Sequence, residues 1–288
     1  MAKKSSDWTV LSMLEWATTY FKENNISSPR MSIEWLLAEV LQIKRLDLYL
    51  QYDRPLSPDE LNALRPLVKR RAGHEPLQYI SGSTDFMNAR IRVSPEVLIP
   101  RLETEQLVEL ILSEHDPSPK NVIDIGTGSG CIAIALKMER PEWQVSALEK
   151  YGAALEVAKK NAQTNQAEIH WLNEDIRQWT NGFTSITESY NLIVSNPPYI
   201  PQHEKEGVEP QVREYEPAEA LFVQEADQYY KTIRDMAAEH LTNGGYLYFE
   251  IHQEYGMEIS GLFDPNRWNV AIFNDYDGNA RFLRAIKR

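Results

Sequence analysis

The sequence has a single cysteine, Cys131, among its 288 residues. One thiol forms neither an intramolecular disulfide nor a cysteine-based zinc site, and a reducing cytoplasm fits such a chain. No uninterrupted apolar stretch approaches the roughly 20 residues that a membrane-spanning helix needs. We therefore expect a soluble cytoplasmic protein with no membrane partner.

Positive charge is also scarce. The chain has 30 lysines and arginines against 42 aspartates and glutamates, for a formal net charge of −12. Because a broad phosphate-binding surface needs clustered Lys and Arg, this balance argues against nucleic acid as a partner. The local cluster Lys69-Arg70-Arg71 is interpreted either as a solvated helix end, where cations favour the helix dipole, or as an RNA contact.

The first 75 residues carry apolar side chains at helical rather than strand spacing. Residues 8–24 and 29–42 each predict an amphipathic helix. Ser57-Pro58-Asp59-Glu60 is a capping-box start for a third helix, which should end near Ala72. Nothing in this stretch is typical of catalysis, so residues 1–75 are predicted to form a small all-helical accessory domain.

The apolar period shifts toward two after this domain, which predicts a β-hairpin linker over residues 76–100. Residues 101–288 then alternate short apolar strands with helices, the pattern of an α/β domain with a mostly parallel sheet. The turn at Asp275–Gly278 favours an antiparallel final pair of strands. The seven expected strands are 121–125, 144–148, 169–172, 192–194, 246–251, 270–274 and 280–286, and the helices among them are 130–139, 152–165 and 226–241.

The glycine-rich stretch Gly126-Thr127-Gly128-Ser129-Gly130 follows the first of these strands. Glycines at a strand-to-helix turn let a ligand approach the backbone. A dinucleotide fingerprint has its third glycine or alanine one position later, where Cys131 stands, so a pyrophosphate is disfavoured. Glu149 follows the second strand, about 20 residues on, where an acidic side chain can bind both ribose hydroxyls. The pattern predicts a nucleoside ligand without phosphates.

Two further carboxylates surround this predicted pocket. Asp124 precedes the glycines and Asp175 follows the third strand. Their negative charge favours a cationic cofactor, and S-adenosylmethionine meets every requirement. Taken singly, Glu149 is equally consistent with a solvated strand end, and Asp175 with a helix N-cap.

The stretch Asn196-Pro197-Pro198-Tyr199 follows the predicted buried strand 192–194. Prolines end the strand because they lack an N–H and have a fixed φ. Asn196 offers a side-chain oxygen, Pro197 a carbonyl and Tyr199 an aromatic ring, which together suit a planar NH2 group. A plain tight turn after a core strand is the alternative interpretation.

These motifs resemble the class I methyltransferases, and specifically the protein-(glutamine-N5) methyltransferases that modify peptide chain release factors. The resemblance covers nearly the whole chain. It also includes Glu75-Pro76-Leu77-Gln78-Tyr79-Ile80-Ser81-Gly82, Val97-Leu98-Ile99-Pro100-Arg101, Glu103-Thr104-Glu105, Tyr215-Glu216-Pro217 with Ala220-Leu221, and Asp277-Gly278-Asn279-Ala280-Arg281. The chain departs from the usual family residues at Leu102, Glu149, Ile176 and His252.

The resemblance implies, in order along the chain, a helical substrate-recognition domain, a hairpin linker and a Rossmann-like catalytic domain. It also implies S-adenosylmethionine as cofactor and the glutamine of a release factor's Gly-Gly-Gln loop as substrate. By position, the implied cofactor contacts are Gly126, Thr127, Gly128, Ser129, Gly130, Glu149, Asp175, Ile176 and Asn196. The implied glutamine contacts are Asn196, Pro197, Pro198 and Tyr199.

An amide nitrogen is a poor nucleophile because its lone pair is delocalised into the carbonyl. The Asn196 oxygen and the Pro197 carbonyl are therefore interpreted as catalytic acceptors of the two amide hydrogens, with no metal required. One alternative is an amino-methyltransferase acting on an exocyclic NH2 of a nucleic-acid base, against which the net charge argues. Another is a non-catalytic binding module with the same fold, against which the intact Asn-Pro-Pro-Tyr stretch argues.

Overall fold

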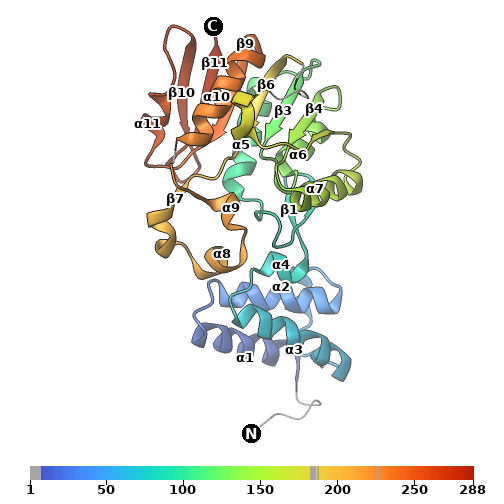
Figure 1. The fold of residues 1–288 in the computed structure, drawn as a ribbon. Helices are drawn as coiled ribbons and strands as arrows, with labels where there is room; N and C mark the ends of the chain where they lie inside the picture. The colour runs from blue at the N-terminus through green and yellow to red at the C-terminus, as the bar shows by residue number, and fades with distance from the viewer. Residues whose placement is uncertain (1–7, 182–185, 187, 226) are drawn as a thin grey trace. The chain divides into compact units, whose positions relative to one another are not determined.

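The computed structural model describes residues 8–181, 186, 188–225 and 227–288 (Figure 1). The chain divides into two compact units. The N-terminal unit holds the described residues up to Gly82 together with Glu209–Tyr215, and the C-terminal unit holds the described residues of Ser83–Val208 and Glu216–Arg288. The helical unit is therefore completed by a short segment from much later in the sequence.

The N-terminal unit is all-helical. The helix α3 (Pro58–Ala72) begins with the predicted capping box. Ser57 Oγ accepts from the Glu60 N–H at 3.2 Å, and the Glu60 carboxylate accepts from the Ser57 N–H at 2.8 Å. Apolar residues such as Leu14, Phe21 and Leu37 form its core. Its helices are α1 (Val10–Glu23), α2 (Pro29–Leu41), the 3-10 helix η2 (Arg45–Leu50), α3 (Pro58–Ala72), α4 (Leu77–Ser81) and α8 (Pro210–Tyr215).

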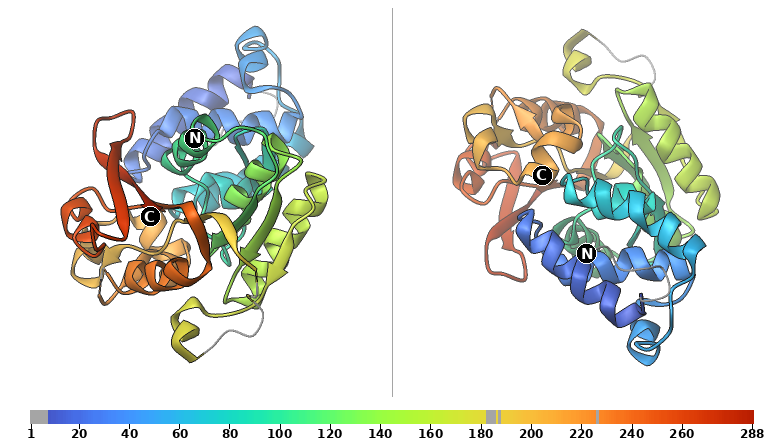
Figure 2. Two further views of the ribbon diagram at one scale, coloured as in Figure 1. Left: turned by 90° about the horizontal axis from the view of Figure 1, so that it is seen from above. Right: turned by 90° about the horizontal axis from the view of Figure 1, so that it is seen from below.

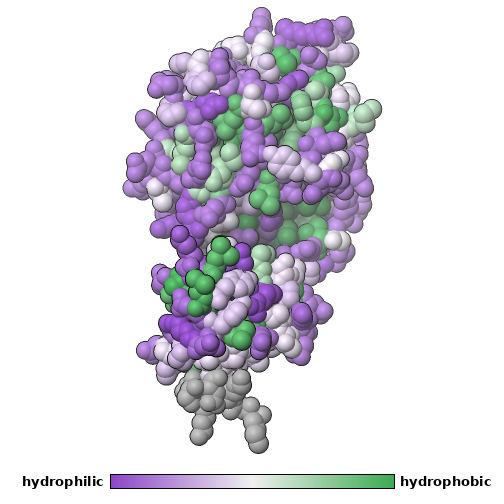
Figure 3. Space-filling view, turned by 180° about the vertical axis from the view of Figure 1, so that it is seen from behind, coloured by the Kyte–Doolittle hydropathy of each residue, from purple (hydrophilic) through white to green (hydrophobic). Residues whose placement is uncertain are grey.

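A buried carboxylate, Glu34 on α2, holds η2 in place. It accepts hydrogen bonds from Arg30 at 2.8 Å, from Arg45 at 2.7 Å and from the Tyr49 hydroxyl at 2.8 Å. Burial acts to raise the pKa of Glu34, but these hydrogen bonds outweigh it and lower the pKa below its ordinary value. The anchored η2 leaves Leu50 85% exposed, and hydrophobic side chains show on the surface of this unit (Figure 3).

The basic cluster at the end of α3 is not a free cationic patch. Arg70 pairs with Glu75, with nitrogen-to-oxygen distances of 2.5 and 2.8 Å. Arg71 is only 4% exposed and donates to Ser32 at 3.1 Å and to Gln211 at 3.0 Å. The expectation of a solvated helix end is wrong for Arg71, which ties α2 and α8 together inside the unit.

The predicted hairpin begins later than the sequence pattern indicated. β1 (Ser83–Phe86) and β2 (Ala89–Arg92) form an antiparallel pair, but Leu77–Ser81 is the helical turn α4. Pro76 precedes this turn, and Gly82 ends it with a φ of +75°. Proline at the start and a left-handed glycine at the end are helix signals that outweigh the alternation of apolar residues.

The C-terminal unit contains the expected α/β fold, with a mostly parallel seven-stranded sheet. The strand order is β10-β11-β9-β6-β3-β4-β5, with β11 antiparallel to both neighbours and the other pairs parallel. The strands are β3 (Asn121–Ile125), β4 (Gln144–Leu148), β5 (His170–Leu172), β6 (Tyr190–Ser195), β9 (Leu241–Glu250), β10 (Trp268–Asn274) and β11 (Ala280–Lys287).

Helices cover both faces of this sheet. α5 (Leu102–Glu114) and α10 (Gln228–His240) lie on opposite faces (Figure 2). Tyr230 and Met236 of α10 join strand residues such as Ile193 in one buried core. The other helices are α6 (Cys131–Glu139), α7 (Gly152–Thr164) and α11 (Gly256–Ser260), with a 3-10 turn η3 (Ile176–Asn181). Residue 226, the predicted start of α10, lies outside the described residues.

The stretch after Tyr199 contains several short elements that the sequence pattern did not indicate. β7 (Ile200–Pro201) pairs in parallel with β8 (Phe222–Val223), and between them lie η4 (Gln202–Gly207), α8 and α9 (Ala218–Leu221). Elements of two to six residues leave no clear period in a sequence, which is why pattern analysis missed them. In the part of the chain that the structure describes, no helix combines the length and apolar character needed to cross a membrane.

His115, directly after α5, is buried among aromatic rings. Its Nε2 lies 3.0 Å from the Tyr248 hydroxyl, and the rings of Trp143 and Tyr246 meet it edge-on. Burial, with a smaller contribution from the charge of Lys120, lowers the pKa of His115 to about 4. The folded state therefore holds this imidazole neutral at pH values where an exposed histidine is charged.

We predict that His115→Phe reduces the loss of stability in acid. The unfolded chain protonates this histidine below about pH 6.5 and the folded chain only near pH 4, so wild-type stability falls as pH drops through that window. Removing the group should shrink the fall in Tm between pH 7 and 4.5 by roughly 5 °C, measured by thermal melts. His170→Asn, at an exposed position, is the matched control. An unchanged pH dependence in His115→Phe would contradict a buried neutral imidazole.

Candidate active site

The topology of the sheet places two loops side by side. β3 lies between β4 and β6, so the strand order reverses at β3, and ligands of open α/β sheets bind at the carboxyl ends of the strands at such a point. Ile125, the last residue of β3, is paired with Ser195, the last of β6. The Ser195 hydroxyl donates to the Ile125 carbonyl at 2.7 Å. The glycine-rich turn and Asn196 therefore begin at adjacent points of the sheet edge.

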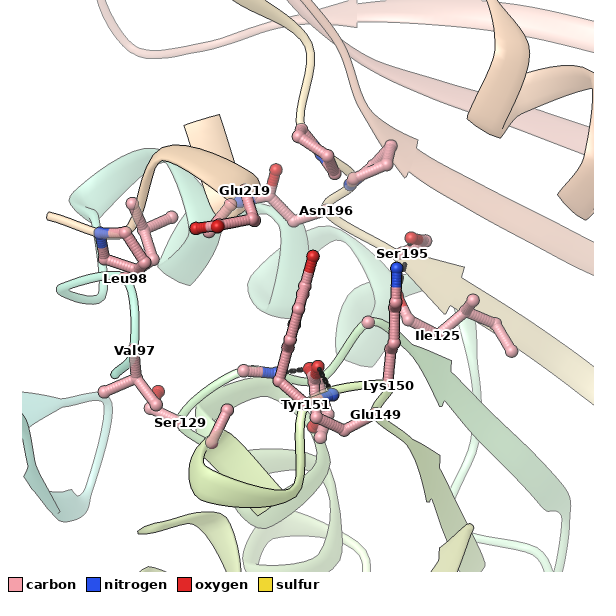
Figure 4. Close-up of a pocket in the computed structure, with 18 of the residues that line it drawn as sticks. Val97, Leu98, Ile125, Ser129, Glu149, Lys150, Tyr151, Ser195, Asn196 and Glu219 are labelled. Atoms are coloured by element: carbon pink, nitrogen blue, oxygen red, sulfur yellow. Dashed lines mark hydrogen bonds between the residues drawn. The ribbon is translucent and has the colours of Figure 1, made fainter. Parts of the chain in front are cut away.

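A cavity of about 330 Å³ opens at this edge, within the usual size range of small-molecule sites. Figure 4 shows Val97 and Leu98 along one side, and Lys150 and Tyr151 rising from the end of β4 toward Asn196. Most of the sequence-predicted residues line it: Gly126, Thr127, Gly128, Ser129, Glu149, Asp175, Ile176, Asn196, Pro197 and Pro198. Gly130 and Tyr199 do not line this cavity.

The three glycines serve two different purposes. Gly126 and Gly128 have φ values of +73° and +55°, and a Cβ built on either meets no described atom within 4 Å. Any side chain there would be strained and would project into open space, so both keep the cradle clear. Gly130 has a φ of +82°, and a Cβ on it would come within 3.1 Å of the Ala158 Cβ. This third glycine allows close packing of α6 on α7 behind the site.

Glu149 holds the glycine turn against the end of β4. Its two carboxylate oxygens accept from the N–H groups of Gly128 and Tyr151, each at 2.9 Å (Figure 4). Only 6% of the residue is exposed, and burial raises the pKa of the carboxyl although these backbone bonds oppose the rise. Each carboxylate oxygen has a further lone pair, so Glu149 retains acceptor capacity toward a ligand.

Asp175 is firmly ionised at the far side of the cavity. Its oxygens lie 3.1 Å from Lys150 Nζ and 2.9 Å from Arg177 Nη2. Burial opposes ionisation, but the hydrogen bonds from Arg177 and Lys150 outweigh it and lower the pKa to about 2. Beside it, Ile176 is 5% exposed and forms an apolar wall together with Tyr229.

Asp124 supports the glycine turn from below. It is fully buried, and it accepts from the Thr127 hydroxyl at 2.5 Å. Burial raises its pKa to about 7 despite that hydrogen bond. Asp124 does not line the cavity, so its expected role as a surrounding negative charge is better described as support for Thr127.

The Asn196 side chain is held by residues from two distant elements. Its Nδ2 donates to Thr104 Oγ1 at 3.1 Å, and Thr104 donates to Glu250 Oε2 at 2.7 Å. The other Glu250 oxygen accepts from the Tyr199 hydroxyl at 3.1 Å. With its NH2 group turned to Thr104, the asparagine has its carbonyl oxygen available to a ligand.

Tyr199 faces a neighbouring cavity instead, which it lines with His203, His252 and Arg281. Burial and the adjacent Glu250 charge raise the pKa of Tyr199, so its hydroxyl remains a neutral donor. The His203 side chain is 76% exposed, so this histidine is largely in solvent.

The wall opposite the strands is fastened by Glu216. This residue is 5% exposed and accepts from the Ile99 N–H at 3.0 Å and from Arg101 Nη2 at 2.5 Å. The bonds join the stretch before α5 to the start of α9, and both stretches line the cavity. A family departure, Leu102, lies beside this wall and is 73% exposed.

Residue patterns did not single out the groups that hold Asn196 or the cavity wall in place. Thr104, Glu216 and Arg101 stood within strings that carried the family resemblance, without any role of their own. Glu250 lies near the end of the expected strand 246–251, and the sequence pattern assigns it no further role. Their roles depend on contacts across 51 to 146 positions of sequence, which no local spacing reveals.

Comparison with known proteins identifies the family. Residues 12–82 match the model described as the PrmC N-terminal domain, and residues 96–214 match the Methyltransferase small domain. The release factor glutamine methyltransferase of Geobacter sulfurreducens is 39% identical over 265 residues, covering 91% of each chain. That of Chlorobaculum tepidum is 37% identical over 291 residues, covering 97% of each chain.

The chain belongs to the release factor glutamine methyltransferase family. Solved structures agree with the fold of the enzyme. The catalytic domain of hMettl16, in complex with the MAT2A 3′UTR hairpin 1, superposes with a TM-score of 0.54 at 19% identity, covering 80% of each chain. A methyltransferase from Pyrococcus furiosus superposes with a TM-score of 0.51 at 16% identity, covering 79% of this chain and 98% of that one. Both similarities concern the fold alone.

Proposed function

We propose that the enzyme transfers a methyl group from S-adenosylmethionine to the side-chain amide nitrogen, N5, of the glutamine in the Gly-Gly-Gln loop of peptide chain release factors. The orientation of Asn196 carries this proposal. Its NH2 group is engaged by Thr104, so its oxygen is the group offered to a substrate amide beside the glycine-lined cradle. The single thiol, Cys131, is buried, which suits an enzyme that works in the cytoplasm.

The residues of the cavity fit S-adenosylmethionine. The open cradle at Gly126 and Gly128 suits close approach of a nucleoside, and Glu149 retains lone pairs for ribose hydroxyls. Ile176 and Tyr229 offer an apolar wall for a base, and the carboxylates favour a cation. When bound, S-adenosylmethionine supplies an electrophilic methyl group, so the reaction requires no metal.

The chain's own contribution is orientation and electrostatics. The Asn196 oxygen and the Pro197 carbonyl accept the two hydrogens of the substrate amide, which directs its lone pair. Both acceptors stabilise positive charge as it develops on the nitrogen. Pro198 keeps the turn stiff, and Tyr199 holds its position through Glu250. Methylation of a nucleic-acid base by the same groups is disfavoured by the net charge of −12 and by the pairing of Arg70 and Arg71.

We further infer that the N-terminal unit recognises the release factor. A glutamine loop offers little area, whereas stable protein recognition buries about 800 Å² per partner. Two side chains of η2 are apolar and strongly exposed, Leu46 at 68% and Leu50 at 85%. Trp35 of α2, with 46% exposure, and Arg45 lie in cation–π contact beside them. An aromatic and aliphatic surface with an arginine is typical of protein interfaces.

We predict that Asn196→Ala lowers the turnover of release factor methylation by about 10², because one oriented acceptor is lost. Mass spectrometry of the Gly-Gly-Gln peptide after incubation with S-adenosylmethionine measures this and tests the proposed function itself. Cofactor affinity should stay within a few-fold of wild type. Turnover close to wild type would remove Asn196 from the acceptor role, and a wild-type enzyme that leaves the glutamine unmodified would refute the proposed function.

Glu149→Ala should weaken S-adenosylmethionine binding by roughly 10- to 100-fold, since hydrogen bonds to a charged group contribute about 1.5–3 kcal/mol each. Isothermal calorimetry provides the measurement, with a thermal melt to verify folding. Glu149→Asp retains a carboxylate and is the matched control, expected to lose less affinity than the alanine variant. Equal affinities for wild type and Glu149→Ala would place the ribose contact elsewhere.

The double substitution Leu46→Ser with Leu50→Ser should raise the KM for an intact release factor by about tenfold, as expected when an exposed apolar contact is lost. Cofactor affinity should not change, because both residues belong to the helical unit. Met257→Ser, at an 84% exposed residue of the other unit, serves as control. Unchanged KM in the double variant would mean that this surface is not the docking site.

A further inference from the structure

Three parts of the C-terminal unit, namely α5, the end of β9 and the stretch after β6, meet at two polar side chains that are almost fully buried. Thr104, in the first turn of α5, is 3% exposed, and Glu250, at the end of β9, is 1% exposed. Thr104 lies between Glu250 and Asn196, with a hydrogen bond to each at 2.7 and 3.1 Å. Polar groups buried to this extent are costly unless they are fully paired.

The chemistry of the three groups fixes the direction of the chain of hydrogen bonds. Thr104 donates its single hydroxyl hydrogen to Glu250 Oε2. The threonine oxygen is then left as an acceptor, and Asn196 meets it with the NH2 end of its amide. The carbonyl end of the amide consequently faces away from Thr104, where the substrate nitrogen needs an acceptor.

Glu250 also binds Tyr199, the last residue of the Asn-Pro-Pro-Tyr stretch. Its second oxygen accepts the Tyr199 hydroxyl at 3.1 Å. Its backbone carbonyl accepts from the Tyr230 hydroxyl of α10, also at 3.1 Å, which holds the end of the strand. One carboxylate therefore connects to the motif at both Asn196 and Tyr199.

We propose that Thr104 and Glu250 are positioning residues, which present the carbonyl oxygen rather than the NH2 group of Asn196 to the substrate amide. This inference rests on the proposed methylation of a glutamine amide. Without the Thr104 hydroxyl, the carboxamide loses the partner that distinguishes its two ends. With its NH2 group turned away from Thr104 and toward the substrate, Asn196 would offer donors to the substrate NH2 and would not accept its hydrogens.

A purely structural role predicts something different. If the Thr104–Glu250 bond only fastened α5 to the sheet, its loss would lower stability and affect every site function. A positioning role instead acts through Asn196, so it should appear in kcat and disappear once Asn196 is removed. Coupling between residues of one network is what a double-mutant cycle measures.

The test compares Thr104→Val and Thr104→Ser in the wild-type and Asn196→Ala backgrounds, using single-turnover methylation of an intact release factor. Thr104→Val keeps the shape and removes the hydroxyl, and it should lower the rate about tenfold, with cofactor Kd and release factor KM within about twofold. Thr104→Ser restores the hydroxyl and should restore the rate. In the Asn196→Ala background, Thr104→Val should cause no further loss.

Two other variants guard against misfolding as an explanation. Ser146→Ala removes a 6% exposed hydroxyl from β4, away from the cavity, and should leave the rate unchanged. Glu250→Gln keeps the shape but can donate to Thr104, which frees the threonine to donate to Asn196 and removes the preference between amide orientations. A fall of about tenfold in kcat is expected for this variant as well, so it decides the matter if Thr104→Val fails to fold.

The outcomes separate the two proposals. An active wild type with Thr104→Val and Glu250→Gln within twofold of its rate would overturn the positioning role and leave the proposed function intact. Equal losses from Thr104→Val in both backgrounds would also overturn it, because the residue would then act independently of Asn196. A wild type that does not methylate the release factor would overturn both.

Discussion

The parallel pairing of β3 with β6 is the constraint on which the site depends. It aligns Ile125 with Ser195, and a buried hydroxyl bond of 2.7 Å joins the two strand ends. The glycine-rich turn and the Asn-Pro-Pro-Tyr stretch, 70 residues apart in sequence, thereby start from one line. A ligand bound over the glycines therefore lies next to a group bound at Asn196. The register of the sheet, rather than a flexible loop, brings the proposed cofactor and substrate sites together.

The carboxylates near this edge of the sheet have different roles because their hydrogen-bond and ion-pair partners differ. Glu149 accepts from two backbone N–H groups and shapes the turn, whereas Asp175 is paired with two cations and stays ionised. Glu250 accepts hydrogen bonds from the hydroxyls of Thr104 and Tyr199. Glu34 repeats the principle in the helical unit, where it fixes η2. Hydrogen-bond donors oppose the desolvation of each carboxylate: they outweigh it for Asp175 and Glu34, whose pKa values are lowered, but not for Glu149 and Glu250, whose pKa values are raised.

Local signals predicted the long elements and the residues at strand ends. The capping box at Ser57, the strands 121–125 and 144–148 and the seven-stranded α/β sheet follow from spacing and capping chemistry alone. The failures have physical causes. α4 is a short helix within a stretch whose apolar residues alternate as in a strand. Arg71 lies at the end of a helix, where a solvated cation is typical, and its partner Gln211 is 140 positions away in sequence. The Asn196 amide is held by Thr104, 92 positions away in sequence, and that contact exists only after α5 has packed on the sheet.

Holding a planar NH2 group is a general task, and the same acceptors would serve a glutamine or a nucleic-acid base equally well. Selectivity must therefore come from what surrounds the acceptors. Glu216 fastens one wall by binding the Ile99 N–H and Arg101, and the chain reaches that residue directly after α8, which belongs to the helical unit. A single stretch of backbone thus passes from the proposed docking unit to the cavity wall. The proposed docking unit and the wall of the cavity are therefore built from residues that adjoin in sequence, whereas the proposed acceptors at Asn196 and Pro197 do not themselves distinguish one planar NH2 group from another.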